Sequence, residues 1–267
     1  METSKLTGKR IEEYMSDGNR FDGRGLDEYR DLEVETGISK KAEGSARVKL
    51  GKTEVIVGVK LGITEPYPDS PDEGNLMVTA ELLPLSSPRI ELGPPKFPAI
   101  ELGRVVDRGI RESHVIDLKK LCIKEGEKVW QVFIDIYSIN DDGGLIDASA
   151  MAAVIALANA RMPKYDEKTD KILYDEGHTD KKIPLTKEIP LTVTAHKIGK
   201  SIFVDPTLEE EDVSNGRVTI GASLDGEIYS LQKGKDAEIG VEEMDGIIDT
   251  TERARKKLFA KLSKYLK

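Results

Sequence analysis

Alternating apolar and polar residues predict several strands in the first half of the chain. In residues 45–61, "SARVKLGKTEVIVGVKL", apolar residues alternate on both sides of a Gly51-Lys pair, which predicts a hairpin with a two-residue turn. Residues 76–83, "LMVTAELL", predict a further strand. Residues 128–139, "KVWQVFIDIYSI", alternate most regularly, so every second side chain faces the same side. Together these segments predict a sheet with one buried face.

Helical periodicity follows at three places. Residues 5–15 predict a short amphipathic helix, and residues 99–121 take on the spacing of a longer one. Residues 147–162, "DASAMAAVIALANARM", are rich in alanine and apolar nearly all round, and Pro163 ends the pattern. A helix without a polar face is stable only when it is buried, so we expect this one to lie between layers of the fold.

The order of hairpins and helices repeats in the second half. Residues 163–189 are polar and turn-prone, and predict a connection between domains. Hairpins are predicted at residues 191–206 and 216–234, the second one turning at an Asp-Gly pair. The capping-box spacing Asp249…Glu252 predicts the start of a C-terminal helix.

This repetition predicts an α+β fold with two similar domains, in which mixed sheets pack against helices. The expected organisation is an N-terminal helix in residues 1–20, a first domain in 21–165, a connector in 166–189 and a second domain in 190–267.

Composition and charge limit the classes of function that the chain can have. A chain of 267 residues with 38% hydrophobic and 33% charged residues is typical of a soluble globular protein. No apolar run reaches the roughly 20 residues that a membrane span needs, and the first residues lack the apolar centre of a signal peptide. The net charge of −9 argues against general coating of nucleic acid, although it permits one local basic patch.

Cysteine and histidine usage predicts neither a disulfide nor a metal site. Cys122 is the only cysteine, so an internal disulfide is impossible and a buried, hydrophobic role is expected for it. His114, His178 and His196 lie far apart in the sequence, without metal-ligand spacing. We therefore expect a cytoplasmic protein without a metal or another cofactor.

The stretch "DDGGLIDAS" places two glycines between the most regular strand and the alanine-rich helix. A helix N-terminus after glycines offers N–H groups and a partial positive charge, which bind anions. Phosphate sites usually add a hydroxyl or a cation, but here Gly143 and Gly144 are followed by Leu145 and Ile146. Asp147 then supplies a negative charge from within the protein. The stretch predicts a self-capped helix whose corner does not bind phosphate.

The segment "ELGRVVDRGIRES" carries Arg104, Arg108 and Arg111 at spacings that align them on one helix face. Guanidinium groups in such a row match the oxygens of phosphates. The alternative is a solvated face on which they pair with carboxylates of the same segment, such as Glu101 and Asp107. From the residues alone both interpretations stay open.

Other signals of chemistry are weak. The acidic run at residues 209–212, next to a Pro turn, could hold a metal, but solvated loops explain such runs more often. The sequence contains neither a GxGxxG or P-loop motif nor a GxSxG nucleophile motif. An aromatic fraction of 5% offers little for stacking on nucleic-acid bases.

Five segments in a fixed order carry a family resemblance, and "FVDPTLEEED" extends it into the second half. They are "NRFDGRGLDEYR", "KAEGSARVKLGKTEVIVGVKL", "NLMVTAELLPL", "ELGRVVDRGIRES" and "INDDGGLIDASAMAAVIAL". With these segments the chain resembles the RNase PH family of phosphorolytic exoribonucleases, and within it the non-catalytic branch found in the archaeal exosome core.

The resemblance implies two linked βαβα-type domains like domain 2 of ribosomal protein S5. It also implies a partner: a catalytic RNase PH-like subunit, three pairs of which form a hexameric ring with RNA-binding cap subunits. Active members carry Ser or Thr and then Arg at the positions of Leu145 and Ile146, and a catalytic aspartate that an ungapped match places on Val218. Asp205 and Asp212 remain, but without a phosphate loop they have nothing to act on. No catalytic residue is therefore expected.

In the resembled subunit the arginines of this helix face the central channel and grip single-stranded RNA. We carry this role to Arg104, Arg108 and Arg111, since binding of a threaded strand needs phosphate contacts and little base reading. The expected function is a non-catalytic, RNA-binding exosome subunit that helps to shape the active site of its partner. The alternatives are a self-sufficient phosphorolytic exoribonuclease and an RNA-binding scaffold outside any degradative complex.

Overall fold

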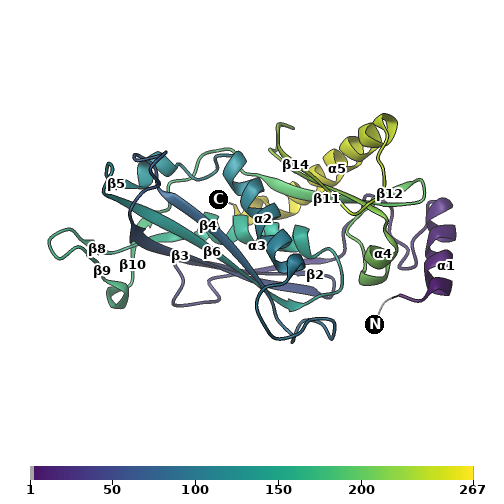
Figure 1. Cartoon of the computed structure of the whole chain (residues 1–267), viewed down its shortest axis with the longest axis horizontal. Helices are drawn as coiled ribbons and strands as arrows, with labels where there is room; N and C mark the ends of the chain where they lie inside the picture. Colours follow the sequence, from purple (N-terminus) through teal and green to yellow (C-terminus); the bar gives the residue numbers. More distant parts are fainter. Residues whose placement is uncertain (1–2, 267) are drawn as a thin grey trace.

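Two sheets with one helix buried between them form the centre of the computed structural model, which describes residues 3–266 (Figure 1). In the first sheet the order is β1-β2-β3-β6-β4, and β5 pairs with β6 at one end. All neighbours are antiparallel except β4 and β6, so the sheet is mixed. Its strands are β1 (Leu32–Thr36), β2 (Gly44–Leu50), β3 (Thr53–Thr64), β4 (Asn75–Leu82), β5 (Cys122–Lys124) and β6 (Lys128–Asn140).

The second sheet is antiparallel with the order β12-β11-β13-β14. Its strands are β11 (Leu191–Ile198), β12 (Ser201–Val204), β13 (Gly216–Ala222) and β14 (Ile228–Gly234). The hairpins predicted from alternation at residues 45–61, 191–206 and 216–234 are all confirmed.

The two halves repeat one arrangement, as the sequence pattern predicts. The first has a hairpin and a strand, then α2 (Phe97–Glu112), β6 and α3 (Leu145–Asn159). The second has a hairpin, then α4 (Leu208–Val213), a second hairpin and α5 (Val241–Leu262). The α+β fold class is thereby confirmed.

Helix α3 lies between the two sheets and contacts β2 and β3 on one side and β11 on the other. Every residue from Ile146 to Ala158 is buried. The prediction of a buried helix is confirmed, and small alanine side chains allow strands to approach it on all sides. At Gly44 a Cβ would lie 2.3 Å from the carbonyl oxygen of Ala156, which shows how closely β2 approaches the helix.

Two predicted helix boundaries are wrong. Helix α2 ends at Glu112 rather than near residue 121, because His114 has a left-handed backbone with φ of 51°, and residues 118–121 form a separate 3-10 turn. Helix α5 begins at Val241, where the Glu243 carboxylate accepts from the N–H of Gly240 at 3.0 Å. The Asp249…Glu252 pattern therefore lies inside the helix.

The polar segment 163–189 is more ordered than the expected connection. Its short strands form two antiparallel pairs, β7 with β10 and β8 with β9, which extend from the left end of the molecule in Figure 1. Pro163 belongs to β7, and the helix before it ends at Asn159. The short strands are β7 (Arg161–Pro163), β8 (Tyr165–Asp166), β9 (Lys171–Ile172) and β10 (His178–Lys182).

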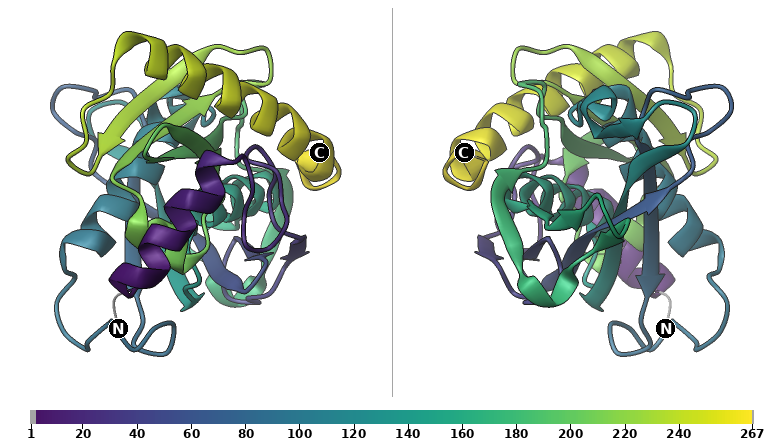
Figure 2. Two further views of the ribbon diagram at one scale, coloured as in Figure 1. Left: turned by 90° about the vertical axis from the view of Figure 1, so that its right-hand side faces the viewer. Right: turned by 90° about the vertical axis from the view of Figure 1, so that its left-hand side faces the viewer.

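Helix α1 (Lys5–Ser16) is present where the pattern predicts it, and it packs on the second domain (Figure 2). Ile11 and Met15 form a small buried cluster with Ile198 and Phe203 of the β11–β12 hairpin. The chain therefore crosses from the second domain to the first at residues 17–31.

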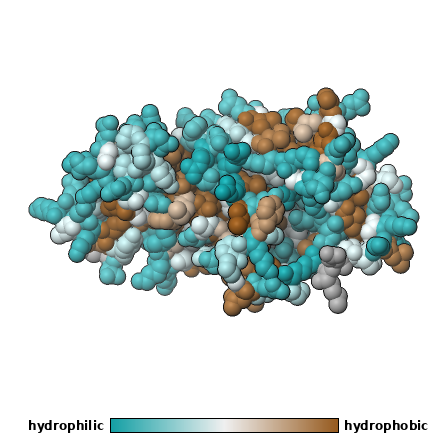
Figure 3. All heavy atoms as spheres, viewed as in Figure 1, coloured by the Kyte–Doolittle hydropathy of each residue, from teal (hydrophilic) through white to brown (hydrophobic). Residues whose placement is uncertain are grey.

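The face in Figure 3 is mostly hydrophilic, with apolar residues at its upper edge, near β14, and at its lower edge, near the loop between β4 and α2. Leu85 and Leu92 of this loop are 76% and 92% exposed, and Phe97, the first residue of α2, is 73% exposed.

No helix in residues 3–266 is long and apolar enough to cross a membrane. The same residues contain no group of three or more histidine, cysteine or acidic side chains arranged to hold a metal ion. Cys122 is partly buried at the start of β5, and His196 is buried in the second domain.

Candidate functional site

Gly143 and Gly144 form the corner between β6 and α3. Both have left-handed backbones, with φ of 83° and 68°, which favour glycine. A Cβ on Gly143 would come within 2.6 Å of the carbonyl oxygen of Pro206, and one on Gly144 within 2.9 Å of Asp205 Oδ1. The glycines are therefore needed for the turn and for the close approach of the second domain.

Two side chains hold the carbonyl oxygens of this corner. Arg30 Nη1 donates to the carbonyl of Asp142 at 2.9 Å, and its Nη2 donates to that of Gly143 at 2.8 Å. Thr53 Oγ1 donates to the same Gly143 carbonyl at 2.6 Å and accepts from the N–H of Asp142 at 3.1 Å. The backbone of the corner is thus fixed by groups of the protein itself.

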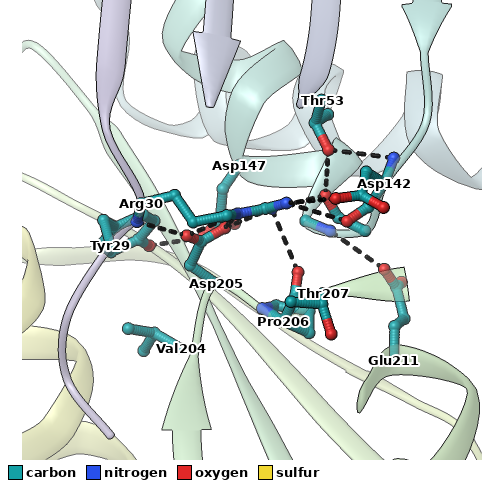
Figure 4. A network of polar contacts seen from close by, with 12 residues as sticks. Tyr29, Arg30, Thr53, Asp142, Asp147, Val204, Asp205, Pro206, Thr207 and Glu211 are labelled. Carbon is teal, nitrogen blue, oxygen red and sulfur yellow. Dashed lines mark hydrogen bonds and ion pairs between the residues drawn. The ribbon is translucent and has the colours of Figure 1, made fainter. Parts of the chain in front are cut away.

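A carboxylate of the same chain lies at the helix end of the corner. The N–H of Gly144, the N-cap of α3, donates to Glu211 Oε2 at 3.0 Å (Figure 4). Burial raises the pKa of Glu211, and the hydrogen bond from Gly144 opposes that rise. Leu145 and Ile146 pack into the core instead of facing the corner. The position that a helix N-terminus offers to an anion is therefore taken by Glu211.

The acidic run at residues 209–212 is not the solvated loop that we predicted. It lies in α4, whose capping box joins Thr207 and Glu210: the Glu210 carboxylate accepts from the N–H of Thr207 at 2.8 Å. This T-x-x-E spacing is readable in the sequence and could have revealed the helix. The contact between Glu211 and Gly144 could not be read, because it joins residues 67 positions apart.

Asp147 lies in the first turn of α3, as predicted, but its side chain bonds across the domains rather than to the helix end. It accepts from Tyr29 Oη at 2.5 Å, from the N–H of Thr194 at 3.0 Å and from Thr194 Oγ1 at 2.6 Å. Burial raises the pKa of Asp147 to about 6, although these hydrogen bonds lower it. The expectation of a self-capped helix is wrong in this respect.

Three arginines of the segment before β1 bind carboxylates of the second domain, and Figure 4 shows one of them, Arg30, beside Asp205. Arg24 Nη1 and Arg30 Nη2 each lie 2.7 Å from an oxygen of Asp205, which is fully buried. Arg20 Nη2 lies 2.5 Å from Glu210 Oε2. These pairs hold the two domains together, and sequence reasoning missed them because their members lie far apart in the chain.

The remaining acidic candidates are engaged in ion pairs. Asp205 is neutralised as described, and Asp212 accepts from Arg89 at 2.7 and 2.8 Å and from Thr3 Oγ1 at 2.7 Å. Burial alone would raise the pKa of Asp212, but these bonds lower it to about 2. The carboxylates of Asp205 and Asp212 are thus both engaged by arginines of the same chain.

The resemblance assigns the family's catalytic aspartate to Val218, which has no carboxylate. The Val218 side chain is buried in the core of the second domain with Ile220 and Ile247. Its neighbours on β13 point the other way: Thr219 contacts Thr194 at 3.0 Å, and Arg217 reaches α2. The residues on either side of Val218 are therefore a cation and a hydroxyl, not carboxylates.

The three predicted arginines of α2 differ in whether other groups of the chain bind them. Arg111 pairs with Asp107 at 2.7 Å and also donates to the carbonyl of Leu76 at 3.0 Å. Arg104 and Arg108 are exposed, and within residues 3–266 neither side chain forms an ion pair or hydrogen bond. The alternative of a self-neutralised helix face thus fits Arg111 only, and two free guanidinium groups remain one helix turn apart.

Family models match both domains of the chain. The model described as "3′ exoribonuclease family, domain 1" matches residues 28–163, and the one described as "domain 2" of the same family matches residues 188–254. The chain belongs to the 3′ exoribonuclease, or RNase PH, family. The family resemblance read from the sequence is thereby confirmed.

Curated relatives within this family are similar over nearly their whole length. The protein named "Exosome complex component Rrp42" of Thermococcus gammatolerans is 47% identical over 90% of this chain and 88% of its own. The protein of the same name from Archaeoglobus fulgidus is 45% identical over 91% of both chains.

Solved structures show the same likeness. A chain of a structure titled "archaeoglobus fulgidus exosome with RNA bound to the active site" superimposes with a TM-score of 0.88, at 44% identity, over 96% of this chain and 98% of that one. A chain from a structure titled "Archaeal exosome core" gives a TM-score of 0.84 at 41% identity, over 97% and 96% of the chains.

Proposed function

We propose that this RNase PH family chain is a non-catalytic, RNA-binding subunit of an archaeal exosome, a ring that degrades RNA from its 3′ end by phosphorolysis in the cytoplasm. The proposal is supported by its similarity to proteins named as exosome component Rrp42 and to a chain of an exosome structure with bound RNA. The single, partly buried Cys122 suits a reducing compartment.

The filled corner between β6 and α3 carries the non-catalytic part of the proposal. Phosphorolysis needs inorganic phosphate held beside the terminal linkage of the RNA. Here the N–H of Gly144 bonds to Glu211, and Leu145 and Ile146 supply no donor. A bound phosphate would have to displace a partly buried carboxylate and lie beside further acidic groups, which electrostatic repulsion opposes. The chain therefore contributes no phosphate site of its own.

The exposed arginines of α2 carry the RNA-binding part. Arg104 and Arg108 present unpaired guanidinium groups at a spacing of one helix turn. Forked donors on a rigid helix bind successive phosphates of a single strand without reading bases. Arg111 is a weaker candidate, because Asp107 and a backbone carbonyl already engage it.

The partner in this proposal is a catalytic RNase PH-like subunit. It supplies the phosphate loop and the acid for attack of phosphate on the terminal linkage, which releases a nucleoside diphosphate and a shortened RNA. This chain shapes that site and holds the strand. Three such pairs form a hexameric ring that carries RNA-binding cap subunits. The exposed apolar loop before α2 suits a chain that other subunits cover.

The test is co-expression of this chain with the catalytic RNase PH-like protein of the same organism, followed by purification and an RNA decay assay. The expected result is a complex that shortens single-stranded RNA and releases nucleoside diphosphates only when inorganic phosphate is added. This chain purified alone should leave the RNA intact under the same conditions.

Two results would contradict the proposal in different ways. Phosphate-dependent shortening of RNA by the single chain would make it a self-sufficient phosphorolytic enzyme. A stable monomer by light scattering that ignores the catalytic protein during co-expression would instead identify a scaffold outside any degradative complex.

A further inference from the structure

Arg104 lies between two acidic residues that could neutralise it. Glu101 precedes it by three positions and Asp107 follows it by three, and side chains at this spacing on a helix are neighbours. Either carboxylate could form an exposed ion pair with Arg104 and compete with a phosphate for it. In the structure both carboxylates bind other arginines.

Asp107 is held by Arg111 of the same helix. Arg111 Nη2 lies 2.7 Å from Asp107 Oδ1, and its Nε lies 3.0 Å from Oδ2, so the pair is bidentate. A third bond, to the carbonyl of Leu76 on β4, fixes the guanidinium. Both oxygens of Asp107 are therefore engaged by Arg111 rather than by Arg104.

Glu101 is held by an arginine of the second domain. Arg217 on β13 is 9% exposed, and its Nη2 lies 2.5 Å from Glu101 Oε1. Glu101 is the only carboxylate paired with this guanidinium within residues 3–266, and the Arg217 Nε donates to no other group there. A nearly buried cation binds its partner carboxylate more strongly than an exposed one does, so Glu101 pairs with Arg217 in preference to Arg104.

A glycine on the neighbouring strand makes room for this contact. Gly234 on β14 pairs directly with Arg217 in the sheet. A Cβ at Gly234 would lie 2.5 Å from Arg217 Nη2 and 2.8 Å from its Nε. The guanidinium thus lies close to the backbone of the edge strand β14, and a side chain at position 234 would require it to move.

We propose that Arg217 is a positioning residue for RNA binding: by holding Glu101 it keeps Arg104 free to bind a phosphate of the strand. This inference rests on the proposed function, because it assumes that Arg104 contacts RNA in the assembled complex. In this arrangement a residue of the second domain determines whether Arg104, on a helix of the first domain, stays unpaired.

The test measures binding of a fluorescent single-stranded oligoadenylate by anisotropy, with the complex of this chain and its catalytic partner. Arg217→Met should weaken binding about two- to fivefold, the range expected when an exposed ion pair competes for one arginine. The slope of log affinity against log salt should also fall by up to about 0.7, the value for one lost phosphate contact on a single strand.

Rescue by a second substitution separates positioning from direct contact. Glu101→Gln alone should bind RNA at least as well as the wild type, and Arg217→Met combined with Glu101→Gln should restore the affinity. Gly234→Ala should weaken binding like Arg217→Met, because it displaces the guanidinium without removing its charge. In an Arg104→Ala background, Arg217→Met should have no further effect.

Wild-type affinity of the Arg217→Met complex would overturn the inference, and so would a double variant as weak as Arg217→Met alone. These results differ from failure of the proposed function. If the inference alone fails, replacing Arg104 and Arg108 together still weakens binding. If the proposed function fails, the wild-type complex does not bind the RNA or those two arginines have no effect.

Discussion

Glu211 and Gly144, which belong to different domains, are joined by a hydrogen bond of 3.0 Å between a carboxylate oxygen and a backbone N–H. The N–H belongs to the N-cap residue of α3, and proteins often bind phosphate at the N-terminus of a helix. The chain has satisfied this donor internally, and the pKa of the partly buried carboxyl is raised by its surroundings.

Replacing Glu211 with alanine should destabilise the protein without creating a phosphate site. The loss should be about 1–3 kcal/mol, because a buried N–H is left without its partner. Urea unfolding measures the loss of stability. Melting temperatures in phosphate and in chloride at equal ionic strength test whether the variant binds phosphate. Glu209→Ala is the matched control, since Glu209 is exposed on the same helix. A selective rise in melting temperature of the Glu211→Ala variant with phosphate would contradict the electrostatic explanation.

Restoring a family-like phosphate loop should not restore activity. Leu145→Ser with Ile146→Arg introduces the missing hydroxyl and cation, but Glu211 still occupies the helix end and Val218 still faces the core. The variant should also be less stable, because Ile146 is only 9% exposed and a charge there would be partly buried. Phosphorolysis by this variant alone would show that the catalytic acid has been misplaced.

Replacing Arg104 and Arg108 together with alanine should weaken RNA binding by the assembled ring and leave its assembly intact. The loss should be roughly tenfold or more, because charge-assisted hydrogen bonds contribute about 1.5–3 kcal/mol each. Anisotropy at several salt concentrations between about 50 and 200 mM provides the affinity and its salt dependence. Arg111→Ala, on the same helix, should have a smaller effect because that guanidinium is already paired. Equal affinities of wild type and double variant at every salt concentration would contradict the assignment.

Asp147 should make the protein less stable as the pH rises from about 4 to about 6. Its pKa is raised from 3.8 to about 6 in the folded state, so the folded protein holds a proton that the unfolded chain has lost. By linkage the free energy of unfolding falls by up to about 3 kcal/mol across this window and is constant above it. Asp147→Asn should remove this contribution, which is obtained as the difference between the urea unfolding curves of the two proteins. If the free energy of unfolding changed equally with pH in both proteins, the titrating group would be a residue other than Asp147.

Asp205→Asn should be the most destabilising of these substitutions. Asp205 is fully buried and pairs with both Arg24 and Arg30, so removing its charge leaves two poorly solvated guanidinium groups. Breaking a buried pair in this way costs about 3–5 kcal/mol. Thermal unfolding measures the effect, and Asp225→Asn in an exposed turn is the control. A change as small as that of the control would show that the interdomain pairs contribute little.

Local patterns were sufficient for most of the fold. Strict alternation identified the hairpins at residues 45–61 and 191–206, and the absence of a polar face placed α3 in the interior. These predictions succeed because strand and helix periodicities depend on neighbours in the chain. The boundaries of α2 and α5 were wrong, since a left-handed residue at His114 and an earlier cap at Gly240 overrode the broader pattern.

The candidate site was only partly readable. The types of residue at Leu145 and Ile146 already excluded a hydroxyl and a cation from the glycine corner, and the spacing of Arg104 and Arg108 placed them on one helix face. Those features are fixed by side-chain chemistry and helix geometry, which the sequence contains in full.

Only the tertiary structure decided which charges remain free. Residues 209–212 look like a solvated acidic run, yet folding brings one of their carboxylates to the glycine corner and another to a buried arginine. Arg104 and Arg108 look no different from Arg111 in sequence, yet Arg111 alone is paired. The contacts of Glu210 and Glu211 join segments far apart in the chain, which a linear pattern does not contain. On α2 each arginine has a carboxylate at helix spacing, and only the folded structure shows that Arg111 alone of the three forms such a pair.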